Sequence, residues 1–165
     1  MTSAFMMPAN RTYLEGPPRQ VPGFSSLHAM VTLLLAEHVS QEGRVLVLGA
    51  GGGLELRAMA EAQPGWQFVG VDPDPGMLSL ASIVCEPYRD RIALHEGRIE
   101  GAPLGPFDGA VSLLTFHFIS REERKPTLRA IRQRLKPEAP FVLAHLSYPE
   151  DEPWTDQPFV DTRRP

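Results

Sequence analysis

A glycine-rich turn and an aspartate about 20 residues later are the features of this sequence best suited to bind a ligand. The turn, Gly49–Gly53, contains four glycines and Ala50, and it follows a short apolar run. A backbone without side chains bends tightly and approaches a ligand closely. Asp72 ends the next apolar run, where its carboxylate can accept hydrogen bonds from both hydroxyls of a ribose. Together they predict a nucleoside site; the alternatives are a turn that only packs a helix on a strand and an aspartate that only caps a helix.

Five short apolar runs alternate with segments of helical spacing, and this order positions the turn. The runs at 44–48, 67–71, 91–95, 107–114 and 140–146 predict strands. Helical spacing predicts helices over 25–38, 54–63, 76–84 and 126–135. Ser120 and Glu123 form a capping-box pattern, and we expect a separate turn before Pro126, because a proline inside a helix removes a hydrogen bond. The alternation predicts an α/β fold, a doubly wound parallel sheet with helices on both faces and ligands at the carboxyl ends of its strands.

Both ends of the chain are rich in proline. Residues 1–23 contain four prolines and two glycines, which predicts an extended N-terminal arm or lid that can fold over the site. Phe5 and Tyr13 of this arm are expected either to pack over the site or to be disordered. Residues 24–148 are predicted to form the core domain and residues 149–165 an irregular C-terminal tail.

Composition limits the classes of partner. A chain of 165 residues has the size of one domain, and a net charge of −4 gives no broad positive field for nucleic acid. A small-molecule partner fits better. The single cysteine, Cys85, and the lack of metal-ligand spacing predict a reducing compartment, the cytoplasm, and no structural metal. The N-terminus does not match a signal peptide, and no apolar run reaches the roughly 20 residues that a membrane helix needs.

The spacing of the glycines distinguishes among cofactors that contain adenosine. In a dinucleotide fingerprint, the third glycine lies three residues after the second and packs the helix beside a pyrophosphate. Leu54 occupies that position here. The spacing Gly49-x-Gly51-x-Gly53 is instead similar to motif I of class I methyltransferases, in which a compact turn accommodates a methionine group. A nicotinamide cofactor is the less favoured alternative.

The resemblance to class I S-adenosylmethionine-dependent methyltransferases extends over about 21–148. Val45–Gly53 resembles motif I, Val69–Met77 resembles the ribose-binding motif, and His95–Ile99 resembles the loop on the adenine side. Within the superfamily, Val21–Phe24 and Thr115–Ile119 resemble the carboxy-S-adenosylmethionine synthase branch, which acts in tRNA wobble-uridine modification. The resemblance implies a Rossmann-like sheet of order 3-2-1-4-5 and S-adenosylmethionine as cofactor, with S-adenosylhomocysteine as product.

The resemblance also implies roles for individual residues. The methionine part of the cofactor would contact Gly49, Ala50, Gly51 and Gly52. The ribose would be held by Asp72, and the adenine would be bordered by Pro73, Met77, Arg98 and Ile99. The pocket floor would be lined by Leu113, Leu114 and Thr115, and the pocket would be closed by Arg19 and Phe24.

The sequence departs from the family pattern at several positions. Val47 stands where motif I commonly begins with an acidic residue, so one polar anchor is missing. Arg98 stands where an aspartate usually accepts from the adenine amino group, and Leu113 replaces an asparagine of the synthase branch. The segment 147–165 is too short to supply the last helix and two strands of the family, so the chain resembles a truncated member. An open edge at the fifth strand predicts a homodimer, cover by the tail, or a truncated chain.

Two further groups of side chains are candidates for function. His117 follows the fourth strand and can act as a general base; the alternative is a partly buried residue in an aromatic segment. His145 is a weaker candidate, and the remaining histidines are expected either to act as caps or to lie on the surface; they are His28, His38 and His95. A cluster of basic residues lies in and next to one predicted helix. The cluster forms either a face for tRNA or other RNA or an ordinary solvated helix surface. Its members are Arg121, Arg124, Lys125, Arg129, Arg132, Arg134 and Lys136.

Three functional hypotheses follow. The first is an enzyme that transfers a methyl group from S-adenosylmethionine to a small oxygen, nitrogen or carbon nucleophile. The second is a truncated, non-catalytic methyltransferase-like module that acts by protein association through its open edge. The third is a nicotinamide-dependent oxidoreductase.

Overall fold

The protein folds around a five-stranded parallel sheet. The structure, a computed structural model, describes residues 8–146. The strand order is β3-β2-β1-β4-β5 and every described pairing is parallel, which confirms the predicted fold class. The strands are β1 (Arg44–Leu48), β2 (Gln67–Asp72), β3 (Ile92–Glu96), β4 (Gly109–Leu113) and β5 (Phe141–Ala144). All of them therefore end at the same edge of the sheet, where the glycine turn and Asp72 lie.

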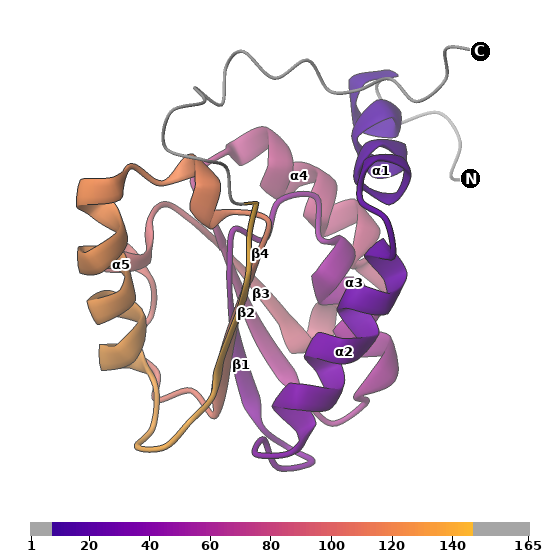
Figure 1. The fold of residues 1–165 in the computed structure, drawn as a ribbon. Coiled ribbons are helices and arrows are strands. Elements are labelled where there is room, and N and C mark those ends of the chain that lie inside the picture. Colours follow the sequence, from indigo (N-terminus) through magenta and orange to yellow (C-terminus); the bar gives the residue numbers. More distant parts are fainter. Residues whose placement is uncertain (1–7, 147–165) are drawn as a thin grey trace.

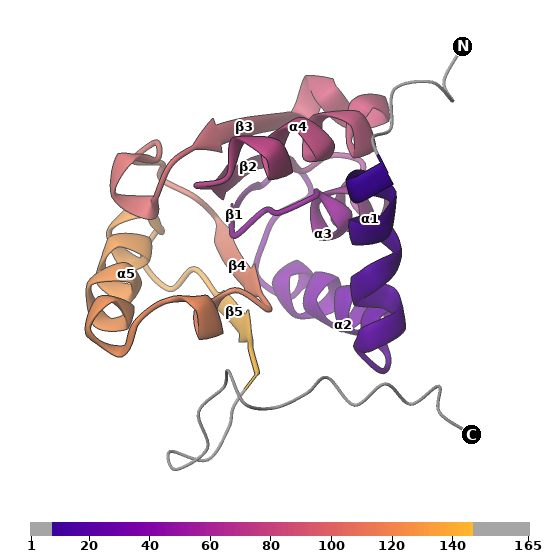
Figure 2. The same cartoon turned by 90° about the horizontal axis from the view of Figure 1, so that it is seen from above.

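Helices cover both faces of the sheet (Figures 1 and 2). One face carries α2 (Phe24–Ala36), α3 (Leu54–Ala62) and α4 (Pro75–Val84), and the other carries α5 (Arg121–Arg134). Short 3₁₀ helices occupy Glu86–Arg91 (η1), Ile99–Gly101 (η2) and Phe116–Phe118 (η3). The layers explain why the predicted strands are continuously apolar, because a strand covered on both faces has no solvated side.

The side chains of the central strand β1 belong to two hydrophobic clusters, one on each face of the sheet. Val45 and Val47 belong to the hydrophobic cluster that contains side chains of α2 and α3, whereas Leu46 and Leu48 belong to the cluster that contains side chains of α5. Alternate residues of a strand point to opposite faces. β1 is therefore packed on both faces, and the glycine turn follows directly from a buried strand.

The prediction of an extended N-terminal arm is wrong for the described part of that segment. Residues Pro8–Gln20 form the helix α1. Pro8 is the first helical residue, where its missing N–H costs no hydrogen bond. Pro17 and Pro18 fall near the other end, and Tyr13, Pro17 and Gln20 line a cavity. Tertiary contacts of this kind offset the low helix propensity of proline, and Phe5 lies outside the described residues.

The expected break before Pro126 is also absent. A single helix, α5, runs from Arg121 to Arg134 with Pro126 inside it. Ser120 caps this helix as its sequence pattern predicts, because its side chain accepts a hydrogen bond from the Glu123 N–H at 3.4 Å and its hydroxyl lies 3.0 Å from Glu123 Oε2. The capped first turn tolerates the loss of one backbone hydrogen bond at the proline.

β5 forms the edge of the described sheet, next to β4. Leu143 on this strand is 38% exposed. The predicted C-terminal tail, 149–165, lies outside the described residues, as does the end of the predicted core domain. Among the helices of residues 8–146, none combines the length and apolar character that crossing a membrane requires.

Candidate cofactor site

The glycine turn leaves β1 in a conformation that requires glycine. Gly49, Gly51 and Gly53 have φ angles of 77°, 47° and 81°, in the left-handed region that side chains disfavour. At Gly49 the space is also closed, since an added Cβ would lie 2.0 Å from Thr115 Oγ1. The turn therefore brings bare backbone to the carboxyl edge of the sheet, between β1 and β4.

Asp72 is oriented by the glycine turn itself. Its Oδ2 accepts a hydrogen bond of 2.9 Å from the Gly51 N–H, and its Oδ1 accepts one of 2.9 Å from the Asp74 N–H. The side chain is only 9% exposed. The helix cap of α4 is Asp74, which accepts from the N–H groups of Gly76 and Met77. Asp72 is thus not the cap, and each of its oxygens keeps a further lone-pair position for a ligand hydroxyl.

A cavity of about 1110 Å³ lies at this edge of the sheet. Most of the predicted site residues line it, although they come from segments far apart in the sequence. They are Phe24, Gly49, Gly51, Asp72, Pro73, Met77, Arg98, Ile99, Leu113, Leu114, Thr115 and His117. The structure therefore brings together the turn, the ribose motif, the adenine-side loop and the segment after β4.

Three predicted site residues are not among the residues that line the cavity. Arg19 is exposed on α1 and forms an ion pair of 2.8 Å with Glu15. Ala50 is fully buried in the core. Gly52 faces α1, since a Cβ there would lie 2.6 Å from Cε1 of Tyr13. Ala50 and Gly52 therefore border the site through their backbone, and Arg19 lies outside it.

Tyr13 packs directly on the glycine turn. A Cβ added to Gly51 would lie 2.7 Å from the Tyr13 hydroxyl. Burial is the largest cause that raises the pKa of Tyr13, Glu55 and Asp72 raise it further, and a backbone hydrogen bond from Gly52 opposes the rise. Packing over the site is one of the two behaviours that the sequence leaves open for Tyr13. Its ring occupies part of the backbone surface on which the methionine group is expected.

Glu55 is a cavity residue that sequence reasoning missed. It is the second residue of α3, in the first turn after the glycines. Burial is the main cause that raises the pKa of Glu55 to about 8; a hydrogen bond from its own backbone N–H opposes the rise, and the nearby Asp72 carboxylate adds to it. The available signal was an acidic residue two positions after Gly53, but position alone does not separate a ligand from a residue that favours a helix N-terminus.

Two histidines line the cavity, although only one of them, His117, was predicted to lie at the site. His117 lines the cavity, and burial is the main cause that lowers its pKa, with His145 and Arg124 adding to the effect. A neutral imidazole is the form that accepts a proton. His28, expected to act as a cap or to lie on the surface, is 8% exposed, lines the same cavity, and makes an edge contact with Phe24 at 4.4 Å between ring centroids. Burial lowers the pKa of His28 as well.

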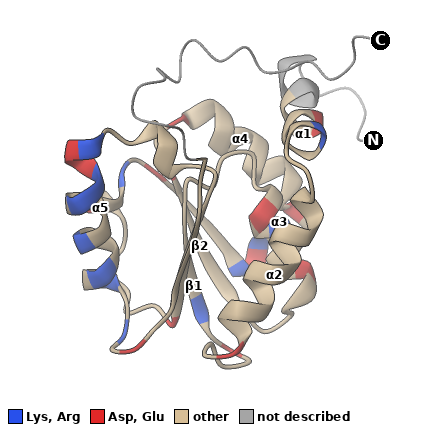
Figure 3. Ribbon diagram, in the orientation of Figure 1, with Lys and Arg blue, Asp and Glu red and all other residues tan. Residues whose placement is uncertain are grey.

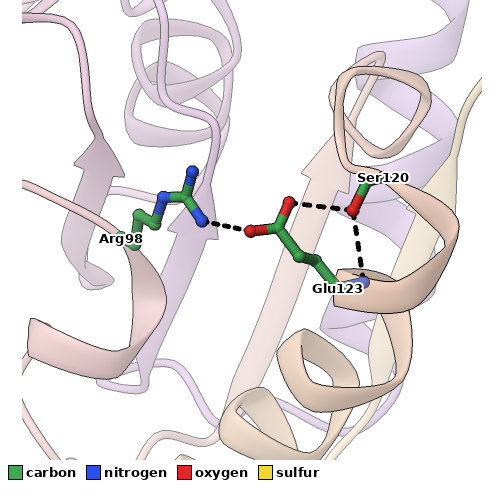
Figure 4. A network of polar contacts seen from close by, with 3 residues as sticks. All are labelled: Arg98, Ser120 and Glu123. Atoms are coloured by element: carbon green, nitrogen blue, oxygen red, sulfur yellow. Dashed lines mark hydrogen bonds and ion pairs between the residues drawn. The ribbon is translucent and has the colours of Figure 1, made fainter.

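Arg98 connects the adenine-side loop to α5. Its guanidinium lies 2.5 Å from Glu123 Oε1, and the other oxygen of Glu123 meets the Ser120 hydroxyl at 3.0 Å (Figure 4). The hydrogen bond from Arg98 is the largest cause that lowers the pKa of Glu123. Arg98 and Glu123 both line the cavity, so this exposed ion pair joins two of its walls.

The predicted positive cluster separates into different environments. Lys and Arg residues follow the outer side of α5 (Figure 3). Arg134, however, is 3% exposed and donates to the backbone carbonyls of Glu100, Ala102 and Ala130. Lys136 pairs with Asp108 at 2.6 Å. The buried Arg134 therefore stabilises the fold rather than extending a charged surface, whereas Lys136 remains exposed and is paired with an acid.

Comparison with known proteins identifies the family. A model described as a methyltransferase domain matches residues 45–138, more than half of the chain. The chain belongs to this methyltransferase family. The matched range contains the glycine turn, Asp72, the adenine-side loop and His117.

Two curated relatives are carboxy-S-adenosyl-L-methionine synthases. The protein from Erwinia tasmaniensis is 28% identical over 131 residues, which cover 76% of this chain and 53% of the relative. The protein from Aeromonas salmonicida is 26% identical over 142 residues, which cover 84% of this chain and 58% of the relative. The methyltransferase chain thus spans little more than half the length of these relatives.

Solved structures share the fold. CalS10, an amino pentose methyltransferase from Micromonospora echinaspora solved with its cofactor bound, matches with a TM-score of 0.70 and 24% identity, covering 91% of this chain and 61% of its own. DesVI from Streptomyces venezuelae matches with a TM-score of 0.71 and 16% identity, covering 90% and 62%. The fold is Rossmann-like, and the cofactor of the family is S-adenosylmethionine.

The methyltransferase site fits this cofactor. The cavity joins a bare backbone turn, a carboxylate with lone pairs to spare, and apolar side chains of Met77 and Ile99 that suit an adenine ring. Val47, where the family commonly has an acid, is fully buried in the core and provides no polar atom to the cavity. In residues 8–146, no group of three acidic, histidine or cysteine side chains could hold a metal ion.

Proposed function

We propose that this chain binds S-adenosylmethionine between the glycine turn and Asp72 and transfers its methyl group to a small nucleophile. The observation that carries the proposal is the hydrogen bond from the Gly51 N–H to Asp72 Oδ2 at the edge of the cavity. It places a backbone turn and a carboxylate side by side, and a ribose joined to a methionine group requires that combination. The family to which the chain belongs supports the same reaction.

The proposal assigns each wall of the cavity a role. The turn backbone holds the methionine part, Asp72 accepts from the ribose hydroxyls, and the adenine lies between the Met77 and Ile99 sides. The floor is formed by Leu113, Leu114 and Thr115. Phe24 closes the cavity from the start of α2. Arg19 is not part of this closure in the observed arrangement, because it pairs with Glu15 on the exposed side of α1.

When bound, the cofactor would supply a methyl group on a sulfonium: a nucleophile would bond to the methyl carbon as the bond from sulfur to this carbon breaks, and S-adenosylhomocysteine would leave as the neutral thioether. The protein contributes by aligning the nucleophile and by excluding water from the cavity. His117 is suited to accept a proton from an acceptor that must lose one, because its lowered pKa keeps the imidazole neutral near pH 7. An amine that is already neutral needs no such base.

Leu113 supports plain methyl transfer over the chemistry of the synthase relatives. Those relatives are 23–28% identical to this chain, and the branch that they represent has an asparagine where Leu113 lies. Leu113 is buried and apolar at the cavity wall. A wall without a polar group there favours the ordinary cofactor, because a buried carboxylate on a modified one would lack a partner.

Calorimetric titration tests the proposal. S-adenosylhomocysteine is expected to bind the full chain, whereas NAD is expected to give no heat of binding. Incubation with S-adenosylmethionine labelled in the methyl group, against a panel of small amines, phenols and carboxylic acids, then identifies the acceptor. Binding of NAD in preference to S-adenosylhomocysteine would instead support the nicotinamide-dependent oxidoreductase.

A second candidate function is a non-catalytic module that associates through its sheet edge. The supporting observation is that β5 is the edge of the described sheet and carries the exposed Leu143, and that α2, which contacts β5, exposes the apolar side chains of Met30 and Leu33. Sheet edges of this kind pair with other chains. Light scattering would show a homodimer under this hypothesis, and titration with S-adenosylhomocysteine would show no binding.

A further inference from the structure

Glu55 is a carboxyl group at the glycine end of the cavity. It belongs to the first turn of α3 and lines the cavity together with Gly49, Gly51 and Asp72. Among the described residues no basic side chain forms an ion pair with Glu55, and the charged group that raises its pKa is Asp72, which has the same sign. Glu55 therefore faces the ligand space without a positive partner.

The titratable groups around Glu55 are also acidic. Tyr13 faces it from α1, Asp72 from β2 and Cys85 from the end of α4. Arg57, on the same helix, lowers the pKa of the Cys85 thiol, against the larger effect of burial. The raised pKa values of Tyr13 and Cys85 keep both groups neutral near pH 7, so the charge at this end of the cavity is that of Asp72, and a positively charged part of a ligand is stabilised there and favours ionisation of Glu55.

Acidic residues also outnumber basic ones along the rest of the cavity wall. Among its described lining residues, one carries a guanidinium or ammonium group, and that residue, Arg98, is already paired with Glu123. Its acidic lining residues are Glu55, Asp72, Asp74, Glu100 and Glu123. Such a cavity favours a ligand with net positive charge, and S-adenosylmethionine carries a sulfonium and an ammonium against one carboxylate.

We infer that the Glu55 carboxylate pairs with the α-ammonium group at the methionine end of S-adenosylmethionine, as the acidic anchor that buried Val47 cannot supply. This inference rests on the proposed function, because it requires the cofactor to lie on the glycine turn. Asp72 is already oriented toward the ribose position by Gly51 and Asp74. The two carboxyl groups then lie on either side of the glycine turn: Asp72 binds the ribose hydroxyls, and Glu55 binds the α-ammonium group of the methionine part.

Pairing between Glu55 and the ligand ammonium is expected to release a proton, which can be measured. With a pKa of about 8, Glu55 in the free protein is mostly protonated at pH 7. A charge-assisted hydrogen bond to an ammonium requires the carboxylate, so the Glu55 proton leaves for the buffer when the ligand binds. Titrations at pH 7 in buffers of different ionisation enthalpy are expected to report the release of nearly one proton per ligand.

The experiment compares two ligands that differ at the amino-acid end. Calorimetry at pH 7 measures S-adenosylhomocysteine and 5′-methylthioadenosine, which keeps the adenine, ribose and sulfur but lacks the ammonium and carboxylate. The variant Glu55→Gln is expected to lose about 10-fold or more in affinity for S-adenosylhomocysteine, to bind 5′-methylthioadenosine as the parent chain does, and to release no proton. Glu61→Gln, which removes an exposed acid from the same helix, is the matched control.

The outcomes separate the inference from the proposed function. An equal loss for both ligands, or no loss for either, overturns the role of Glu55, because 5′-methylthioadenosine has no group for it to bind. Unchanged proton release in Glu55→Gln overturns it as well. If the parent chain binds neither ligand, the proposed function itself fails, and the role of Glu55 fails with it.

Discussion

The Gly51 N–H donates a hydrogen bond of 2.9 Å to Asp72 Oδ2, and this bond joins the bend after β1 to the end of β2. A second bond, from the Asp74 N–H, holds the other oxygen. Asp72 therefore has one orientation before any ligand arrives. A side chain that is already fixed loses little conformational entropy on binding, so its hydrogen bonds contribute more to affinity.

The first prediction concerns Asp72 and the ribose. Asp72→Asn keeps the shape but replaces one acceptor oxygen with a donor, which conflicts with the Gly51 N–H or with a ribose hydroxyl. The affinity for adenosine and S-adenosylhomocysteine is expected to fall about 10- to 100-fold, the effect of losing a hydrogen bond to a charged group. Isothermal titration calorimetry measures both affinities.

Free adenine, which has no ribose, is the control ligand for Asp72→Asn. Its affinity is expected to be the same in the parent chain and the variant. A matching loss for adenine would show that the substitution disturbs the cavity as a whole and that Asp72 does not act through the ribose.

Local patterns in the sequence predict the strands, the glycine turn and the helix cap correctly. Continuous apolar runs predict strands because both faces of the sheet are covered, and Val45–Leu48 is buried on both sides. The glycine turn and Asp72 were found for the same reason, since strand ends in a parallel sheet meet at one edge. Ser120 caps α5 as its three-residue spacing to Glu123 predicts.

Sequence reasoning failed where distant contacts decide the outcome. The prolines of α1 predict an extended arm, yet the helix forms and lays Tyr13 against Gly51 and Gly52. Glu55 and His28 are ordinary in sequence, and only the packing of other elements around them makes them cavity residues with shifted pKa values. Burial of a single polar side chain depends on the tertiary arrangement, which a local pattern does not contain.

The second prediction concerns the conformation of the turn. Gly49→Ala places a Cβ at a φ of 77° and against Thr115. The free energy of unfolding is expected to fall by about 2 kcal/mol or more, because left-handed strain and a steric clash add together. Chemical denaturation measures the change. Gly16→Ala, in helix α1 with its nearest neighbour at 4.0 Å, is expected to be neutral or slightly stabilising.

The third prediction concerns the pH dependence of stability at Glu55. Its pKa is about 8 in the folded chain against an ordinary value of 4.5, so the folded state binds the proton more tightly. Stability from this group is complete below pH 4.5 and is lost as the pH rises through 8. Glu55→Gln cannot ionise and is expected to be more stable than the parent chain at pH 8.5, by at least about 1 kcal/mol.

Denaturation of Glu55→Gln and the parent chain at pH 4 and pH 8.5 measures this difference. At pH 4 the two chains are expected to unfold with similar free energies, because Glu55 of the parent chain is largely protonated there in both the folded and the unfolded state. Glu61→Gln controls for the loss of one acidic residue from α3. A stability gain that is equal at both pH values would show that ionisation of Glu55 is not its source.

The last prediction concerns Tyr13, whose ring lies on the part of the turn where the methionine group is expected. Ligand binding must then displace the ring from Gly51 and Gly52. Tyr13→Ala is expected to speed the association of S-adenosylhomocysteine several-fold in stopped-flow measurements, because the step that clears the turn is removed. Tyr13→Phe keeps the ring and is expected to associate at the parent rate. Faster dissociation from Tyr13→Ala, with association unchanged, would mean instead that the ring closes over the bound ligand, as a contact formed after binding affects only the rate at which the ligand leaves.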